Sequence, residues 1–336
     1  KLTRIATVPL GAEVTGIFLT DEGDLFFNVQ HPSGTNTATN SINSINSMPI
    51  NTGTVGVLAG VNFNNLPATL PDSPVPASEE EKQLVTTAIG QYQVLGQTGD
   101  TYNGDLPEGL GHIYTLDGGT LVLENDMPDF NGFLPTGEGQ GFLFSNWEEL
   151  PGGMSRMQIE RDEQGMWTVT DVMMLDFSPV WGTAANCFGS MSPWGTPLTS
   201  EEWVVDSTVD STTDASWNDP NEVATNARIG RMWEMTAPDV PNPYNYGYIA
   251  EVTEPAADEP VIVKHLAMGR YEHENSTVMP DGRTVYLSQD DTGGVLFKFV
   301  ADVAEDLSAG TLYGAKLTQD VGQNDPATTG FDVEWV

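Results

Sequence analysis

A single cysteine followed by two adjacent glutamates is the most chemically informative stretch of this 336-residue sequence. After Cys187 come a turn-rich segment, Ser192-Pro193-Trp194-Gly195, and the pair Glu201 and Glu202. A thiolate suits iron, zinc or copper as a ligand, whereas carboxylates suit calcium, magnesium or ferric iron. The segment from Asn186 to Trp203 therefore predicts part of a metal site, to which other parts of the chain must add ligands.

A second group of charged residues follows the alternating strand predicted over residues 261–268. The segment 269–275 contains Arg270, His273 and Glu274 within six positions. One guanidinium, one imidazole and carboxylates so close together are unusual for a plain turn. This segment is therefore a candidate for metal binding through Glu274 and for catalytic assistance by Arg270 and His273.

Two more carboxylate groups follow predicted strands. The strand over residues 285–288 leads into Asp290 and Asp291, and the strand over residues 121–123 ends in Glu124-Asn125-Asp126. Taken singly, each pair is more typical of a turn or a cap than of a metal ligand. Their significance depends on whether the fold brings the strand ends together.

Short strands joined by turns dominate the chain. Apolar residues alternate with polar ones on both sides of turns rich in Asp and Gly, the pattern of a β-hairpin. Such hairpins are predicted over residues 5–31, 113–123, 159–169 and 276–287. Their repetition, with variable insertions, predicts an all-β fold and favours a β-propeller. The irregular spacing leaves a β-sandwich as the alternative.

In a propeller, the carboxylates at different strand ends would lie in the same region of the fold. Equivalent strand ends of different blades meet at one end of the central channel, so carboxylates from several blades and one thiol would lie together. Such a cluster of like charges is unfavourable by several kcal/mol unless a multivalent cation neutralises it. The predicted fold therefore includes a metal site at the central channel.

The remaining segments predict one short helix and two long insertions. Residues 78–89 begin with a serine cap and an acidic first turn, and then place apolar residues on one face, which predicts a helix. Residues 33–75 and 204–226 are polar and lack apolar periodicity, which predicts surface loops. With no clear linker, residues 1–336 are expected to form one domain.

Composition narrows the classes of partner. Twelve Lys and Arg against 48 Asp and Glu give a formal charge of −36. That charge repels nucleic acid and anionic membrane surfaces, and it suits surroundings rich in cations such as calcium. One cysteine excludes an intrachain disulfide, and no apolar run of about 18 residues predicts a membrane span. A small molecule is the expected partner.

Several of these segments resemble the PhoX-type alkaline phosphatases. The resemblance is most specific over residues 186–202 and over the pair of segments 246–252 and 269–274. It extends to residues 284–291, 106–111 and 16–32. It implies a secreted, periplasmic or extracellular β-propeller phosphomonoesterase with an iron and calcium cofactor, acting on small phosphate esters.

The resemblance also implies roles for individual residues. Cys187 would bind Fe³⁺ through its thiolate, Glu202 would be a metal-binding carboxylate, and Glu201 would be a further candidate. Glu274 would bind the metal cluster, and Asp290 or Asp291 would bind Ca²⁺. The family has Asn-His-Glu where this chain reads Glu124-Asn125-Asp126, so Asp126 would replace a glutamate ligand.

Two departures from the family pattern leave another function open. The Arg-Pro-Glu motif of the family has no counterpart, because Leu106 precedes Pro107-Glu108. The segment 16–32 resembles a part near the family's C-terminal end, so the order is permuted or incomplete. A catalytically inactive, calcium-stabilised extracellular propeller is therefore the alternative, and a lactonase-like calcium propeller is a third, weaker one because it needs no thiolate.

Overall fold

Four antiparallel sheets of four or five strands form most of the fold in this computed structural model, which describes residues 2–39, 48–204, 227–235, 241–291, 293–317 and 332–336. The first sheet contains β2 (Glu13–Leu19), β3 (Leu25–Gln30), β4 (Thr54–Ala59) and β6 (Gln91–Gln97). The second contains β9 (Pro128–Gly137), β10 (Gln140–Trp147), β11 (Gly153–Arg161) and β12 (Trp167–Met174). The third contains β13 (Asn186–Met191), β14 (Pro197–Glu201), β15 (Ile249–Val252) and β16 (Ile262–Lys264). The fourth contains β17 (His273–Val278), β18 (Thr284–Gln289), β19 (Leu296–Val303), β20 (Asp306–Leu317) and β21 (Val333–Trp335).

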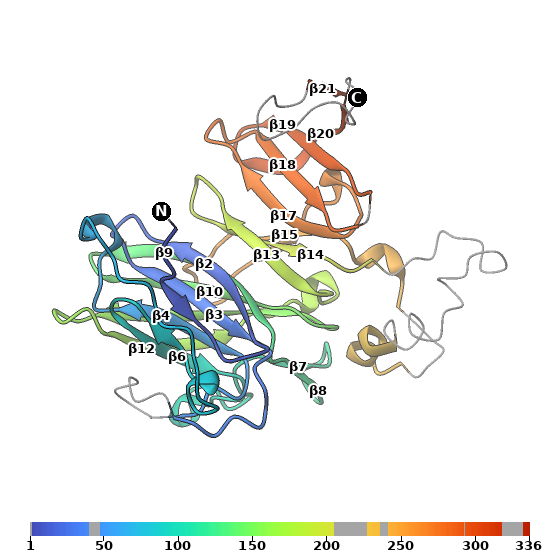
Figure 1. Cartoon of the computed structure of the whole chain (residues 1–336). Helices are drawn as coiled ribbons and strands as arrows, with labels where there is room; N and C mark the ends of the chain where they lie inside the picture. The colour runs from blue at the N-terminus through green and yellow to red at the C-terminus, as the bar shows by residue number, and fades with distance from the viewer. Residues whose placement is uncertain (1, 40–47, 205–226, 236–240, 292, 318–331) are drawn as a thin grey trace.

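The sheets are built and stacked like consecutive propeller blades. Within each sheet the strands follow one another in chain order, and the first strand forms one edge. These first strands contact each other in the order β2, β9, β13 and β17. Figure 1 shows the sheets succeeding one another from the N-terminal to the C-terminal part of the chain. The all-β, propeller-type prediction is confirmed.

Hydrophobic layers between neighbouring sheets hold the stack together. Phe26 of the first sheet packs with Leu143 and Trp167 of the second. Phe144 on β10 belongs to a cluster shared with Val252 of the third sheet. A third cluster contains residues of β14, β15, β17, β18 and β19. Because successive residues of β10 point to opposite faces, its one strand contributes to two layers. Three successive layers exclude the two-sheet sandwich.

The predicted hairpins are confirmed, and aspartate side chains stabilise their turns. Strand β2 pairs with β3, β11 with β12, and β17 with β18, while β7 (His112–Tyr114) pairs with β8 (Leu121–Glu124). In the β17–β18 turn, Asp281 accepts backbone hydrogen bonds from Arg283 (2.9 Å) and Thr284 (2.8 Å). Asp162 and Asp117 make equivalent bonds in their turns. This is the local chemistry that makes Asp-Gly turns recognisable in sequence.

The helix predicted over residues 78–89 is a single 3-10 turn, η2 (Glu81–Gln83). Its cap is present, because the Glu81 backbone N–H donates to the Ser78 hydroxyl (3.1 Å) and the Glu81 carboxylate accepts the backbone N–H of Ser78 (2.9 Å). The prediction beyond Gln83 is wrong: β5 (Thr86–Thr87) pairs with β1 (Ala6–Thr7). Thr86 and Thr87 are β-branched and favour a strand, and their pairing with β1 replaces the continuation of the helix.

Other short helical elements lie in connections. They are η1 (Phe63–Asn65), η3 (Tyr102–Gly104), η4 (Ser178–Val180), η5 (Arg231–Trp233), η6 (Pro243–Asn245) and η7 (Leu266–Met268), and residues 227–230 form an α-helical turn. Among the described residues, no helix is long and apolar enough to cross a membrane.

The insertion predicted over residues 33–75 needs correction. It contains β4, whose six residues are all buried, so this part is a core strand rather than a surface loop. The Thr-Val-Gly-Val-Leu-Ala sequence of β4 is a fully buried strand, and such strands lack the alternation that the prediction sought. Of the insertion predicted over residues 204–226, only Val204 lies within the described residues.

Candidate metal centre

Three neighbouring sheets place acidic or thiol side chains at the same two positions of their first hairpin. The first position is the second residue of the first strand, and the other is the residue directly after the second strand. These residues are Asp129 and Glu148 in the second sheet, Cys187 and Glu202 in the third, and Glu274 and Asp290 in the fourth. The strand register explains the repeat, because Pro128 pairs with Trp147, Asn186 with Glu201 and His273 with Gln289.

A β-bulge or irregularity accompanies this end of each hairpin. The register shifts between Ser145 and Trp147, between Asn186 and Gly189, and between His273 and Asn275. Bulges redirect side chains and are common beside active sites. In the first sheet the equivalent positions hold Val14 and His31, which follow the Glu13–Gln30 pair.

Cys187 lies at the centre of the resulting cluster. The sulfur of its buried thiol lies 3.7 Å from both Asp129 Oδ2 and Glu274 Oε2, and its one S–H can donate a weak hydrogen bond to either oxygen. Ligand atoms of Asp129, Glu148 and Cys187 lie within 4.8 Å of one another, and so do those of Cys187, Glu202 and Glu274. The two groups share the sulfur, so five candidate ligands surround one small region.

The carboxyl groups of the cluster lie close enough to interact with one another. Hydrogen bonds link Asp129 to Glu148, Glu148 to Glu202, and Glu202 to Asp290. Burial raises the pKa of Asp129 to about 6, of Glu148 to about 7 and of Glu202 to about 9, with neighbouring carboxylates adding to the effect. Burial raises the pKa of Glu274, and the nearby Asp290 carboxylate raises it further. These carboxyls resist ionising together without a cation.

The pKa of the Cys187 thiol is raised for the same reasons as the pKa values of the carboxyls. Burial raises the pKa of Cys187, and the carboxylates of Asp129, Glu148, Glu202 and Glu274 raise it further. In the described part of the chain, no ion pair joins any of these carboxylates to a basic side chain. A multivalent metal ion would supply the missing positive charge and deprotonate the thiol.

Two buried amides orient members of the cluster from neighbouring sheets. Gln30, at the end of β3, donates to Glu148 Oε2 (2.7 Å). Asn146, on β10, donates to the carbonyl oxygens of Cys187 (2.7 Å) and Phe188 (3.2 Å). Those two carbonyls lie where the β13–β14 register is irregular. Asn146 therefore replaces ladder hydrogen bonds at the point where Cys187 is presented.

The donor set fits a metal site. One thiolate is a soft ligand of the kind that iron accepts, whereas Asp129, Glu148, Glu202 and Glu274 offer hard oxygens suited to Ca²⁺ or Fe³⁺. The candidate ligands come from β9, β13 and β17 and from the ends of β10 and β14. They lie at the contacts between the first strands, where a propeller has its central channel.

Sequence comparison assigns the chain to a family. The sequence profile described as "Alkaline phosphatase PhoX" matches residues 155–336, just over half of the chain. The chain belongs to the PhoX alkaline phosphatase family. The matched region includes Cys187, Glu202 and Glu274, and it ends beyond Asp290. A search of curated proteins finds no match.

Solved structures show more distant likenesses. One is Pseudomonas fluorescens PhoX in complex with vanadate, a transition-state analogue, with 17% sequence identity and a TM-score of 0.46. That comparison covers 96% of this chain and 56% of the Pseudomonas chain, so this chain spans little more than half the length of that relative. Another is CoXyl43, a β-xylosidase/α-arabinofuranosidase from a compost metagenome, with 11% identity, a TM-score of 0.35, and coverage of 93% and 78%. Both TM-scores are below 0.5, and membership of the PhoX family rests on the sequence profile.

Of the metal ligands expected from the PhoX resemblance, the structure brings Cys187, Glu202 and Glu274 together. Asp290 adjoins them through its hydrogen bond to Glu202. Asp291 is exposed, and its carbonyl oxygen accepts a turn bond from Gly294 (2.9 Å). It lies outside the cluster.

Glu201 lies on the other face of β14 and is occupied by structural contacts. It is fully buried, pairs with Lys264 (3.0 Å), and accepts backbone N–H bonds from Ala184 (3.0 Å), Gly247 (3.1 Å) and Tyr248 (3.0 Å). Successive side chains of a strand point to opposite faces, so Glu201 and Glu202 do not both point into the cluster. Glu201 connects two loops and β16 instead of joining the cluster.

The two residues expected to assist catalysis differ in their surroundings. His273 is fully buried, its ring stacks on Tyr271 (3.7 Å between centroids), and its Nε2–H donates to the Gly269 carbonyl (3.2 Å). Burial lowers the pKa of His273 to about 3. Arg270 is half-buried, donates from Nε to the Tyr246 carbonyl (3.0 Å), and lies over the Tyr244 ring. His273 is therefore a packing residue here, whereas Arg270 keeps contact with the surface.

Asp129 and Glu148 are cluster members that sequence reasoning missed, and Asp126 lies outside the cluster. Asp126 contributes its carbonyl oxygen to the His31 backbone N–H (3.2 Å). A usable signal was present: Asn146-Trp147-Glu148 fits the family's Asn-His-Glu better than Glu124-Asn125-Asp126, with only the central residue changed. Asp129 carried no comparable signal and was found through its position on β9.

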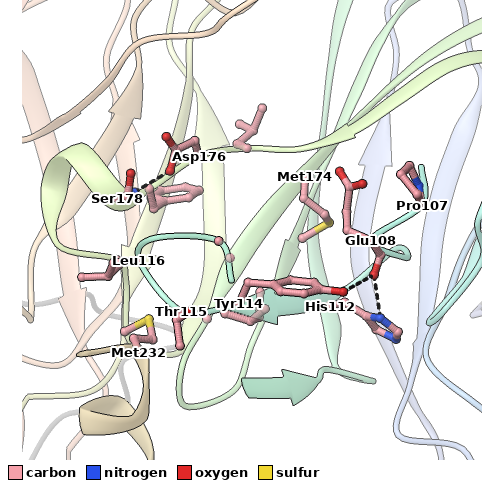
Figure 2. Close-up of a pocket in the computed structure, with 17 residues that line it drawn as sticks. Pro107, Glu108, His112, Tyr114, Thr115, Leu116, Met174, Asp176, Ser178 and Met232 are labelled. Atoms are coloured by element: carbon pink, nitrogen blue, oxygen red, sulfur yellow. Dashed lines mark hydrogen bonds between the residues drawn. The ribbon is translucent and has the colours of Figure 1, made fainter. Parts of the chain in front are cut away.

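Pro107 and Glu108, the remnant of the Arg-Pro-Glu comparison, line a different pocket. Figure 2 shows them beside the β7–β8 hairpin, where the Glu108 carbonyl accepts hydrogen bonds from His112 (2.8 Å) and Tyr114 (3.2 Å). No cluster member lines this pocket. The structure therefore gives Glu108 a setting separate from the metal centre.

Proposed function

We propose that the cluster around Cys187 binds Fe³⁺ and Ca²⁺ and that the chain hydrolyses phosphate monoesters. The observation that carries the proposal is the convergence of one thiol and four carboxyl groups from three sheets, with no paired basic side chain in the described residues. Membership of the PhoX family supports a phosphatase-like activity. The substrate would be a small phosphate ester.

The residues divide according to their donor atoms. Cys187, with Asp129 and Glu274 on either side of its sulfur, would hold iron. Glu148, Glu202 and Asp290, which are linked by carboxyl contacts, would hold calcium. Bound metal ions would neutralise phosphoryl oxygens and lower the pKa of a water molecule. Gln30 and Asn146 would keep the ligands in place through their amide hydrogen bonds.

Arg270 is the candidate for contacting the phosphoryl group. Its guanidinium can donate to two oxygens of a phosphate at once, and the hydrogen bond from Nε to the Tyr246 carbonyl fixes one edge of that guanidinium. Arg270 lies four residues before Glu274, at the start of the hairpin that supplies two cluster members. The proposal therefore assigns substrate contact to Arg270 and none to His273.

The proposal includes a periplasmic or extracellular location. A formal charge of −36 and a carboxylate-rich site suit surroundings in which calcium is abundant. The family resemblance points the same way.

Metal analysis combined with an activity assay tests the proposal. The purified chain would be loaded with Fe³⁺ and Ca²⁺, analysed by mass spectrometry, and assayed with p-nitrophenyl phosphate. Cys187→Ser should lose iron, and Glu202→Gln should lose metal and turnover. The exposed residue Glu163 provides a matched control, since Glu163→Gln removes one carboxylate from the turn between β11 and β12, outside the cluster.

A catalytically inactive, calcium-stabilised extracellular propeller is the second candidate. It is favoured by the placement of Pro107 and Glu108 in a separate pocket, so that no Arg-Pro-Glu arginine reaches the cluster from that segment. Binding of calcium without iron, together with no turnover of p-nitrophenyl phosphate, would establish this candidate and reject the phosphatase.

A further inference from the structure

A cavity of about 540 Å³ lies between the β7–β8 hairpin and the segment that joins β12 to η4. Its wall residues share none with the metal centre. This volume is in the range of sites that hold small organic ligands.

With His112 neutral, the charged side chains that line the cavity are all negative. Glu108 and Asp176 are its two carboxylates, and no lysine or arginine lines it. In the described residues the Glu108 carboxylate has no hydrogen bond or ion pair, and Asp176 uses Oδ1 to accept the Ser178 backbone N–H (2.8 Å). Figure 2 shows Asp176 on the left of the view and Glu108 on the right. Negative charge is therefore available to a ligand.

The rest of the wall offers aromatic and thioether surface. Tyr114 and Phe177 provide rings, and Met174 and Met232 provide polarizable side chains. The position of Tyr114 is fixed, because its hydroxyl donates to the Glu108 carbonyl (3.2 Å). Aromatic faces beside carboxylates attract organic cations through the ring quadrupole and direct charge.

We propose that this cavity binds a small organic cation with an apolar body, of the alkylammonium class. The negative charges of Glu108 and Asp176 would attract the positive group into the cavity, and the apolar body would contact Met174, Phe177 and Met232. The site does not depend on the phosphatase proposal, because it shares no residue with the metal centre.

Calorimetric titration with three probes of similar length tests this site. Hexyltrimethylammonium should bind with a Kd below about 1 mM, whereas hexyl sulfate and 1-octanol should bind at least about tenfold more weakly. Glu108→Gln and Asp176→Asn should each weaken ammonium binding by about fivefold, and Asp176→Asn keeps the oxygen that caps Ser178. Glu163→Gln, on the β11–β12 turn, should leave binding unchanged.

Charge reversal distinguishes specific cation binding from non-specific binding to an apolar cavity. Glu108→Lys should favour hexyl sulfate over hexyltrimethylammonium, while circular dichroism and metal content remain those of the parent protein. Equal binding of all three probes by the parent, or unchanged preference in Glu108→Lys, would overturn the proposal. Absence of ammonium binding by the correctly folded parent at 10 mM probe, about ten times the Kd expected here, would also overturn it.

Discussion

Asn146 donates its side-chain amide to the Cys187 carbonyl oxygen at 2.7 Å, which connects the second sheet to the irregular part of β13. Asn146 is fully buried, so this contact is made without competition from solvent. The backbone segment that carries the thiol is thus held by a strand of the neighbouring sheet. Cys187 is positioned by packing between sheets as well as by its own strand.

The first prediction concerns this contact. Asn146→Ala should weaken iron retention by about tenfold, because the carbonyls of Cys187 and Phe188 lose their donor and the bulge relaxes. The measurement is the thiolate-to-iron absorption band of the iron-loaded protein, compared with Cys187→Ser, in which it should vanish. Thr170→Ala, on an exposed position of β12, is the control. An unchanged band and iron affinity in Asn146→Ala would refute a positioning role.

The second prediction distinguishes two neighbouring glutamates. Lys264→Met should destabilise the fold by about 3 to 5 kcal/mol, because it leaves the fully buried Glu201 without its counter-ion. The double variant Glu201→Gln, Lys264→Met should recover part of that loss. Glu202→Gln should instead abolish metal binding with little loss of metal-free stability at neutral pH. Denaturant titrations of the metal-free variants, with metal analysis, would check both; equal behaviour of the two glutamates would contradict the assignment.

The third prediction concerns pH. In the metal-free protein, burial raises the pKa of Asp129 from 3.8 to about 6, of Glu148 from 4.5 to about 7 and of Glu202 from 4.5 to about 9. The folded state thus holds protons that the unfolded state releases. Stability from these groups is therefore complete below pH 3.8 and is lost as pH rises to about 9.

The measurement is the free energy of unfolding of metal-free protein from pH 5 to pH 9. General repulsion in this acidic chain has the same sign, so Glu202→Gln isolates the cluster. Above pH 7, Glu202 is the main cluster carboxyl that still holds its proton. The free energy of unfolding of the variant should therefore depend less on pH in this range. Loading with metal should reverse the slope, because metal replaces these protons. A parallel decline in both metal-free proteins would count against the shift at Glu202.

The fourth prediction concerns Arg270. Arg270→Ala should lower kcat/KM for p-nitrophenyl phosphate by about 10- to 100-fold at unchanged metal content, because a bidentate donor to the phosphoryl oxygens is lost. Arg270→Lys should recover only part of this, since an ammonium cannot make the paired contact. Arg283→Ala is the control, because Arg283 donates to the carbonyls of Ala301 (2.9 Å) and Asp302 (2.6 Å) in a turn. Unchanged KM and kcat in Arg270→Ala would exclude the role.

The amino-acid sequence by itself determined the hairpins and the chemical type of the site. Asp-Gly turns specify their conformation through contacts within a few residues, as at Asp281, so they are readable locally. The capping pair Ser78 and Glu81 was readable in the same way, but the extent of the helix was not. Pairing with Ala6 and Thr7, some 80 residues earlier in the chain, ended it.

Tertiary structure decided which acidic residues join Cys187. Asp129 and Glu148 enter the cluster because their hairpin has the same register and end irregularity as those of Cys187 and Glu274. Glu201 is excluded although it adjoins Glu202, because a strand directs neighbouring side chains to opposite sides. The sequence shows that a residue can bind metal, but the direction of its side chain depends on strand register and on contacts between sheets. Those contacts join residues far apart in the chain, so only the folded arrangement selects the ligands.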